Sequence, residues 1–128
     1  MKVVLDTHTF IWWDSDPSQL SATALDLCTD PTNQLILSLA SLWEMQIKYQ
    51  IGKLSLRLPL AEIISHQQAT NAVILLPITS EHIFALDSLP MAHKDPFDRL
   101  LVAQAISEGA PLISADSIFA SYPVQVLW

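Results

Sequence analysis

Residues 93–106 read HKDPFDRLLVAQAI and mark the start of a helix. Asp95 can cap this helix, since its side chain would accept an amide of the first turn, and Pro96 fits the first helical position, where no amide is needed. Asp98 then lies in the first turn, where the helix dipole favours a negative charge. The residues three, four and seven positions further on are apolar, so we expect Asp98 on the face turned toward the core. A carboxylate there needs a proton, a cation or a hydrogen-bond donor.

The composition predicts one globular domain over residues 1–128. The chain is 51% hydrophobic with a mean hydropathy of +0.35, and its length allows a sizeable core. It has only 2 Gly against 8 Pro, which argues against long flexible linkers. No internal repeat or segment of low complexity divides the sequence.

The N-terminus and the cysteine content predict a cytoplasmic protein without a membrane segment. The apolar start of the chain is broken by Asp6, which makes it a poor signal peptide, and no apolar run approaches the length of a membrane span. The one cysteine, Cys28, permits no internal disulfide and fits a reducing compartment. Because it falls in a predicted apolar helix, we expect it to serve packing.

The net charge of -7 and the isoelectric point near 4.7 count against a protein that grips nucleic acid by neutralising phosphates. The basic residues are segregated along the chain. Lys48, Lys53 and Arg57 follow one predicted helix, while Lys94 and Arg99 flank Asp98. A site that holds cations would lessen the charge objection, because the bound ions attract phosphate.

Short apolar runs alternate with helical patterns along the whole chain. Strands are predicted at 3–5, 35–37, 73–76, 111–114 and 124–127. Helices are predicted after the capping or starting residues Thr7, Ser21, Ser38 or Ser41, Pro59, Thr79 or Ser80, and Asp95. This alternation predicts a three-layer α/β fold, with a mostly parallel central sheet of about five strands, helices on both faces and right-handed crossovers.

Four acidic residues are expected to meet at one edge of this sheet. Asp6 and Asp116 follow the first and fourth strands, and ligands of such folds bind at the carboxyl ends of the strands. Glu44 and Asp98 lie early in helices that begin at the same edge. Simpler interpretations stay open for these two: Glu44 can pair with Lys48 one helical turn on, and Asp98 can serve only as a helix cap.

Four carboxylates in one cleft cannot remain both empty and fully ionised. Two unit charges about 4 Å apart repel by roughly 4 kcal/mol at an effective dielectric near 20. The acids must therefore hold protons or metal, and all-oxygen ligands suit Mg²⁺ or Mn²⁺. Carboxylates that hold one or two such ions are typical of phosphoryl-transfer sites.

Four short motifs carry a family likeness that spans nearly the whole chain. They are Leu5-Asp6-Thr7-His8, Ser41-Leu42-Trp43-Glu44, Asp95-Pro96-Phe97-Asp98-Arg99 and Ile113-Ser114-Ala115-Asp116. In this order and spacing the chain resembles PIN-domain ribonucleases, in particular the VapC-like toxins of bacterial toxin–antitoxin pairs. The resemblance implies a PIN-like fold and an Mg²⁺- or Mn²⁺-dependent endoribonuclease that cuts single-stranded RNA. It also implies a metal-activated water that attacks the phosphodiester and leaves a 3′ hydroxyl and a 5′ phosphate.

The same resemblance assigns roles to individual residues. The catalytic and metal-binding residues that it implies are Asp6, Glu44, Asp98 and Asp116. Further candidates are Thr7, Asp95, Ser114 and Arg99, with the two hydroxyls close to the metal or the scissile phosphate. Ser114 stands where a Thr is frequent in the family, and the hydroxyl is kept.

The histidines are expected to play supporting parts. His8 and His93 each lie two residues from a candidate acid. Because imidazole favours softer metal sites, we expect these two to orient carboxylates or cap backbone groups. His66 and His82 carry no motif and are predicted at the surface.

Three tryptophans admit two interpretations. Trp12, Trp13 and Trp43 could stack on bases, but on short helices of an apolar-rich chain we favour the core or a subunit interface. The apolar content is consistent with a homodimer and with a docked antitoxin that covers the remaining apolar surface. In the family, the antitoxin tail lies over the active-site cleft, and an acidic pocket would accept an Arg or Lys from it.

Two alternatives to the nuclease remain at this point. A phosphohydrolase of the haloacid dehalogenase type also begins with an apolar strand that ends in Asp and uses Mg²⁺. It needs a second Asp two residues on, where this chain has His8. A catalytically silent PIN-fold binding module would keep the fold and act only through its partner.

Overall fold

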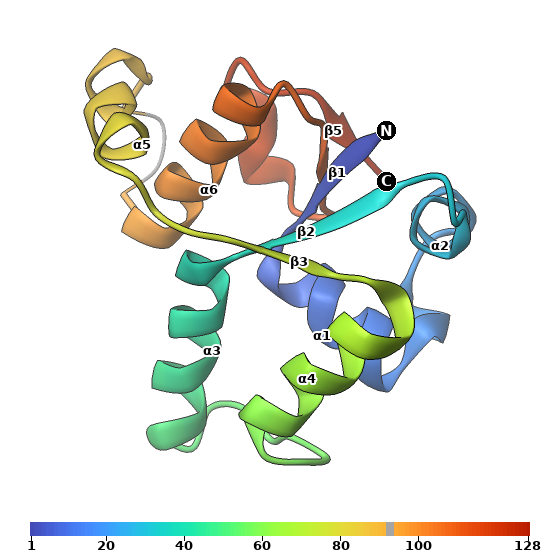
Figure 1. Cartoon of the computed structure of the whole chain (residues 1–128). Coiled ribbons are helices and arrows are strands. Elements are labelled where there is room, and N and C mark those ends of the chain that lie inside the picture. Colours follow the sequence, from blue (N-terminus) through green and yellow to red (C-terminus); the bar gives the residue numbers. More distant parts are fainter. Residues whose placement is uncertain (92–93) are drawn as a thin grey trace.

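A five-stranded, wholly parallel sheet lies between two layers of helices in the computed structural model, which describes residues 1–91 and 94–128 (Figure 1). The strands are β1 (Lys2–Leu5), β2 (Gln34–Ser38), β3 (Ile74–Leu76), β4 (Leu112–Ile113) and β5 (Val126–Leu127). Their order in the sheet is β3-β2-β1-β4-β5. The predicted three-layer α/β fold is confirmed, and the last three strands are shorter than their apolar runs suggested.

Six α-helices connect these strands in the part of the chain that the structure describes. They are α1 (Thr7–Ser15), α2 (Ala22–Thr29), α3 (Leu39–Gln50), α4 (Leu60–Asn71), α5 (Ser80–Ala85) and α6 (Pro96–Glu108). Shorter 3₁₀ turns are η1 (Pro17–Gln19), η2 (Leu86–Ser88) and η3 (Ser117–Ser121). Over the two described ranges, no helix has the length and apolar character that crossing a membrane requires.

The helix starts follow the capping residues in the sequence. Ser21, Ser38, Thr79 and Asp95 each accept a backbone amide of the helix that follows. The prediction that Thr7 caps the first helix is wrong, because Asp6 accepts the amide of Thr9 at 2.7 Å and Thr7 is already helical. A candidate catalytic acid therefore also fixes the start of α1.

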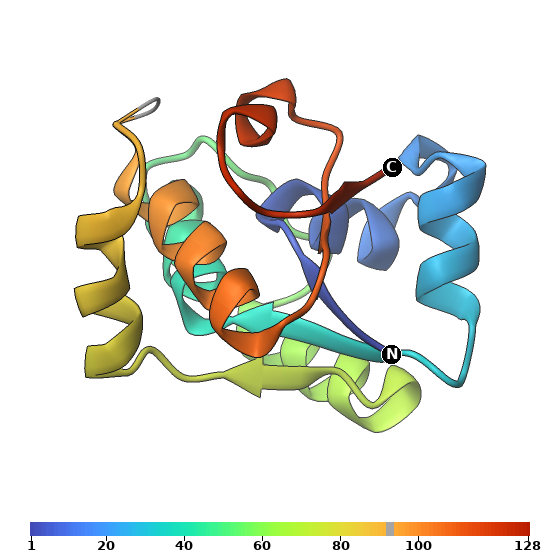
Figure 2. The same ribbon diagram turned by 90° about the horizontal axis from the view of Figure 1, so that it is seen from above.

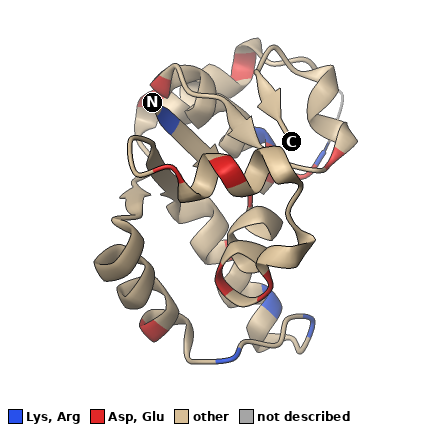
Figure 3. Ribbon diagram, turned by 90° about the vertical axis from the view of Figure 1, so that its right-hand side faces the viewer, with Lys and Arg blue, Asp and Glu red and all other residues tan. Residues whose placement is uncertain are grey.

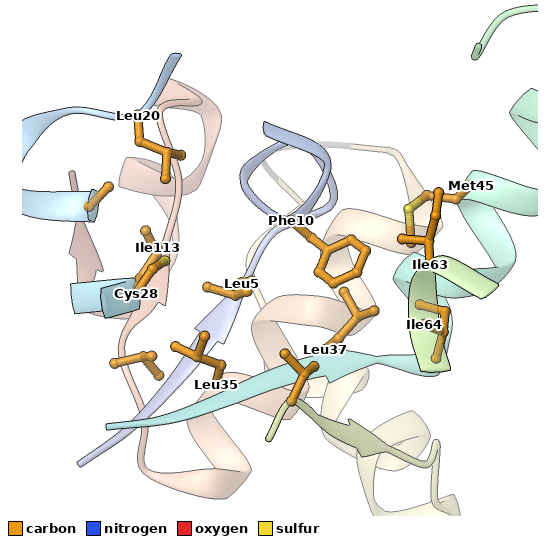
Figure 4. Packing of buried hydrophobic residues seen from close by; sticks show 13 residues of the cluster. Leu5, Phe10, Leu20, Cys28, Leu35, Leu37, Met45, Ile63, Ile64 and Ile113 are labelled. Carbon is orange, nitrogen blue, oxygen red and sulfur yellow. The ribbon is translucent and has the colours of Figure 1, made fainter. Parts of the chain in front are cut away.

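Alternate residues of the strands face two separate cores. Leu5 and Leu37 face the layer formed by α1 to α4, and Phe10 of α1 points toward Leu37 (Figure 4). Val4 and Ile36 face the opposite layer, where α6 and η3 pack. Figure 2 shows α5 on the outer side of α6, away from the sheet. Both faces of the central strands are thus buried, as their continuous apolar runs predict.

The chain changes direction across the sheet between β1 and β4. Strands β1, β2 and β3 follow one another outward, and the chain then returns past β1 to form β4 and β5. The loops that leave β1 and β4 therefore diverge and open a crevice at the carboxyl ends of these two strands. This is the topological switch point at which α/β folds bind ligands.

The surface prediction for His82 is wrong, whereas His66 is exposed as predicted. His82 is 4% exposed, and its Nδ1 accepts the amide of Thr79 at 3.0 Å in the capping box of α5. It also lies 3.4 Å from Nε2 of Gln104 on α6. His82 is thus buried by its capping role in α5 and by its contact with Gln104, and no sequence motif indicated either. His93 lies outside the described residues.

Cys28 is a packing residue, and its thiol should be unreactive in the native protein. It is buried in α2, and burial raises its pKa to about 11, because the thiolate would lose its hydration. We expect iodoacetamide at pH 8 to alkylate the native chain at least about tenfold more slowly than the urea-unfolded chain. Mass spectrometry of both samples over time measures this, and equal rates would contradict the assigned burial.

Candidate functional site at the carboxyl ends of the strands

Asp6 lies at the crevice between β1 and β4 and is held from both sides. Its Oδ1 accepts the amide of Thr9 at 2.7 Å, and its Oδ2 accepts a short hydrogen bond from the hydroxyl of Ser114. Ser114 follows β4, is 2% exposed, and accepts the amide of Asp116 at 3.0 Å. Because the first bond ties Asp6 to the start of α1 and the second joins it to the residue after β4, Asp6 has a fixed orientation at the switch point.

A cavity of about 230 Å³ opens directly beside this carboxylate. Its lining residues are Asp6, His8, Trp12, Ala115 and Asp116. The carboxylate of Asp116 accepts the amide of Ile118 at 3.0 Å and so caps η3 at the edge of the cavity. Two of the four acids selected from the sequence therefore share one cavity.

Glu44 is connected to the same region through Thr7. It is 7% exposed on α3, and Thr7 donates its hydroxyl to Oε1 of Glu44 at 2.6 Å. Lys48 donates to the other oxygen, Oε2, at 2.9 Å. The ion pair with Lys48, which the sequence left open as the simpler interpretation, is therefore present. Glu44 also contacts Thr7, the residue after Asp6, and so lies at the inner border of the site.

Asp95, Asp98 and Arg99 lie together at the start of α6. Asp95 caps the helix by accepting the amides of Phe97 and Asp98, at 2.9 and 3.2 Å, and Asp98 is half-buried. The guanidinium of Arg99 donates to the backbone oxygens of Pro90 at 2.7 Å and Leu86 at 3.3 Å. These bonds give Arg99 a structural role in holding η2 and the residues after it.

The acids at this edge offer oxygen donors to a cation without forming a tight cage. Within residues 1–91 and 94–128, no three His, Cys, Asp or Glu side chains gather closely enough to hold a metal ion. Mg²⁺, however, keeps several waters and is usually bound through one or two carboxylates. Asp6 and Asp116 supply two carboxylates at one cavity, so the donor chemistry fits a hard divalent cation.

Most basic side chains are already engaged with groups of the protein. Lys2 pairs with Glu108 at 3.2 Å, Lys48 with Glu44, and Arg57 with Asp14 at 2.9 Å. Together with Arg99, this engages four of the six Lys and Arg. The blue segments at the bottom of Figure 3 belong to the end of α3 and the connector 51–59. The cavity therefore has few cations with which to bind phosphate directly.

A group of aromatic side chains borders the cavity. The sequence pattern identified only some of these residues. The ring of His8 lies 5.8 Å from that of Trp12, and Trp12 lies 6.0 Å from Trp128, measured between ring centroids. The sequence marks His8, beside Asp6, and Trp12, but nothing in the local pattern around Trp128 places it beside α1. The contact arises from the fold, because β5 is on the β4 side of β1.

The fold and the site define a doubly wound α/β protein with carboxylates at its topological switch point. The family model for the PIN domain matches residues 3–125. The chain therefore belongs to the PIN-domain family. It is also similar to Ribonuclease VapC22 of Mycobacterium tuberculosis, with 28% identity over 121 residues that cover 94% of this chain and 91% of the relative.

Solved structures share the fold at low sequence identity. A chain in the structure of VapBC2 from Rickettsia felis, bound to a DNA fragment from its promoter, matches with a TM-score of 0.73 and 16% identity over 99% of this chain and 98% of that chain. A chain of a toxin–antitoxin complex from Klebsiella pneumoniae matches with a TM-score of 0.63 and 18% identity, covering 98% and 96% of the two chains. These likenesses confirm the PIN-like fold.

Proposed function

We propose that the chain is an Mg²⁺- or Mn²⁺-dependent endoribonuclease that cuts single-stranded RNA and is the toxin of a toxin–antitoxin pair. The main support is the position of Asp6, held between Thr9 and Ser114 at a cavity that it shares with Asp116. Membership of the PIN-domain family and the similarity to Ribonuclease VapC22 agree with this activity.

In this proposal the acids bind the ion and their neighbours orient them. The resemblance implies direct ligation by Asp6 and Asp98, with Glu44 and Asp116 acting directly or through bound water. Because Asp116 lines the cavity with Asp6, we assign the cation to Asp6 and Asp116 instead, with Glu44 and Asp98 acting directly or through bound water. A bound divalent ion lowers the pKa of its water and offsets charge on the phosphodiester. Ser114 and Thr9 fix the orientation of Asp6, and Thr7 fixes that of Glu44. Such outer hydrogen bonds keep the donor oxygens in place.

The proposed partners follow from exposed apolar surface. A groove between α3 and α4, lined by residues that include Leu42, Trp43 and Ile64, has a volume of about 620 Å³, and we assign it to the antitoxin in addition to the acidic cleft. Phe84 of α5 and Met91, which follows η2, are 73% and 76% exposed, and we propose that these apolar side chains lie in a homodimer interface. The toxin would work in the cytoplasm, where its RNA substrate is found.

The proposal predicts RNA cleavage that depends on a divalent ion. We expect the purified protein to cut an unstructured RNA in Mg²⁺ or Mn²⁺, to lose this activity in EDTA, and to regain it when the ion is restored. Denaturing gel electrophoresis of an end-labelled RNA measures each step.

Other outcomes of the same experiment contradict the proposal in different ways. Cleavage that is unchanged in EDTA would exclude the metal dependence. Tight Mn²⁺ binding without cleavage of any RNA would favour the binding module. Phosphate release from small phosphate esters would favour the haloacid dehalogenase type, for which His8 stands in the place of the required second Asp.

A further inference from the structure

The cavity beside Asp6 has two chemically different sides. On one side are the carboxylates of Asp6 and Asp116, and on the other are His8 and Trp12. His8 is exposed, and its ring is inclined by 44° to that of Trp12. Trp128 contacts Trp12 with an interplanar angle of 55° and so supports its position. An aromatic surface thus lies within the cavity that holds two of the four candidate metal ligands.

The charge distribution leaves RNA binding with little support from basic side chains. The net charge is -7, and Lys2, Lys48 and Arg57 are already in ion pairs. A metal ion can attract one phosphate at the acids, but it does not hold the rest of a flexible strand. Stacking of bases on aromatic rings needs no positive charge and accepts any base, because every base has a π-face.

We propose that Trp12, with His8 at its edge, forms a stacking platform for one nucleobase next to the phosphate that is cut. This inference rests on the proposed ribonuclease function. A neutral, flat base fits the aromatic side of the cavity, whereas the acids repel a phosphate that no metal neutralises. The platform would hold the strand beside Asp6 and fix which phosphate reaches the acids. Trp12 is then a substrate-binding residue.

The test compares RNA oligonucleotides that lack one base at a time. Wild-type protein and Trp12→Leu cut a short single-stranded RNA and a series of copies, each with one abasic position, under single-turnover conditions. The cleavage rate is measured at subsaturating protein. For the wild type we expect one position near the cut where loss of the base lowers this rate about five- to a hundredfold. Trp12→Leu should cut the complete RNA more slowly than the wild type by a similar factor. Removal of the base at that position should then lower its cleavage rate hardly any further.

Further variants separate stacking from damage to the fold. Trp12→Phe keeps a ring and should recover much of the position-dependent effect. His8→Ala alters an exposed side chain and should cause a smaller loss at the same position. Tyr49→Leu removes a half-exposed ring from the end of α3, outside the cavity, and should match the wild type. Trp12 also packs against the hydrophobic core, so its replacement could lower stability. The thermal midpoint of every variant is therefore measured.

Each result has a distinct meaning. If the wild type cuts RNA and its abasic profile is the same in Trp12→Leu, the stacking platform is wrong and the nuclease stands. The platform would also be overturned if Trp12→Leu and Trp12→Phe lowered the cleavage rate equally and the loss were the same for every abasic position. If the wild type cuts no RNA, the proposed function is wrong, and the platform is overturned with it.

Discussion

Replacing Asp6 by Asn is expected to lower RNA cleavage about a thousandfold while the protein stays folded. Asn caps helices about as well as Asp, and its amide oxygen can still accept the amide of Thr9. The negative charge that would bind the cation is lost, however. Metal ions stabilise the transition states of such reactions by several kcal/mol, and each 1.36 kcal/mol corresponds to a tenfold change in rate.

The measurement needs a readout of metal binding as well as activity. Calorimetric titration with Mn²⁺ should show weaker binding to Asp6→Asn, and the thermal midpoint should stay close to that of the wild type. Asp26→Asn removes the same charge from an exposed position on α2 and serves as the matched control. Asp98→Asn tests the contribution of α6 in the same assay. Near-normal cleavage by Asp6→Asn, with intact metal binding, would contradict the assignment of Asp6.

The order of the elements was predictable because their start and stop signals are local. Asp95 and Pro96 define the start of α6, and Gly109 ends it in a left-handed conformation with φ of 61°. The buried strands are short apolar runs between such helices, so a parallel sheet follows from the pattern. The same local signals predict Asp6 directly after the first strand and Asp116 after the fourth, and the structure has Asp6 next to β1 and Asp116 as the N-cap of η3 after β4.

The contacts that build the site were less predictable, because they join residues far apart in the chain. Nothing in the sequence shows that Ser114 donates to Asp6, or that Thr7 reaches Glu44. Asp6 rather than Thr7 caps α1, because its backbone is extended where β1 ends and Thr7 already belongs to the helix. The sequence therefore marks both the acids and the hydroxyls of Thr7 and Ser114, but not the contacts through which these hydroxyls orient Glu44 and Asp6.

Contacts between residues far apart in the chain also hold the helices together, and the buried polar group around Gln104 allows a test of this. Gln104 is 0% exposed on α6, accepts a short hydrogen bond from the hydroxyl of Ser38, and donates to the backbone oxygen of Pro77 at 3.3 Å. Ser38 also caps α3, the helix that carries Glu44, by accepting the amide of Ala40 at 3.0 Å. Gln104 thus joins α6 to the start of α3.

Gln104→Leu is expected to reduce the free energy of unfolding by about 3 kcal/mol, more than a hundredfold in the folding equilibrium. Leu fills a similar volume, so the loss comes from the buried Ser38 hydroxyl and the Pro77 oxygen, which no longer have their partner. Urea unfolding measures the change, and Gln125→Leu, at an exposed position, should stay within about 0.5 kcal/mol of the wild type. Equal stability of the two variants would mean that apolar packing alone joins α6 to α3. A loss confined to Gln104→Leu would instead show that one buried amide connects the helices that carry Glu44 and Asp98.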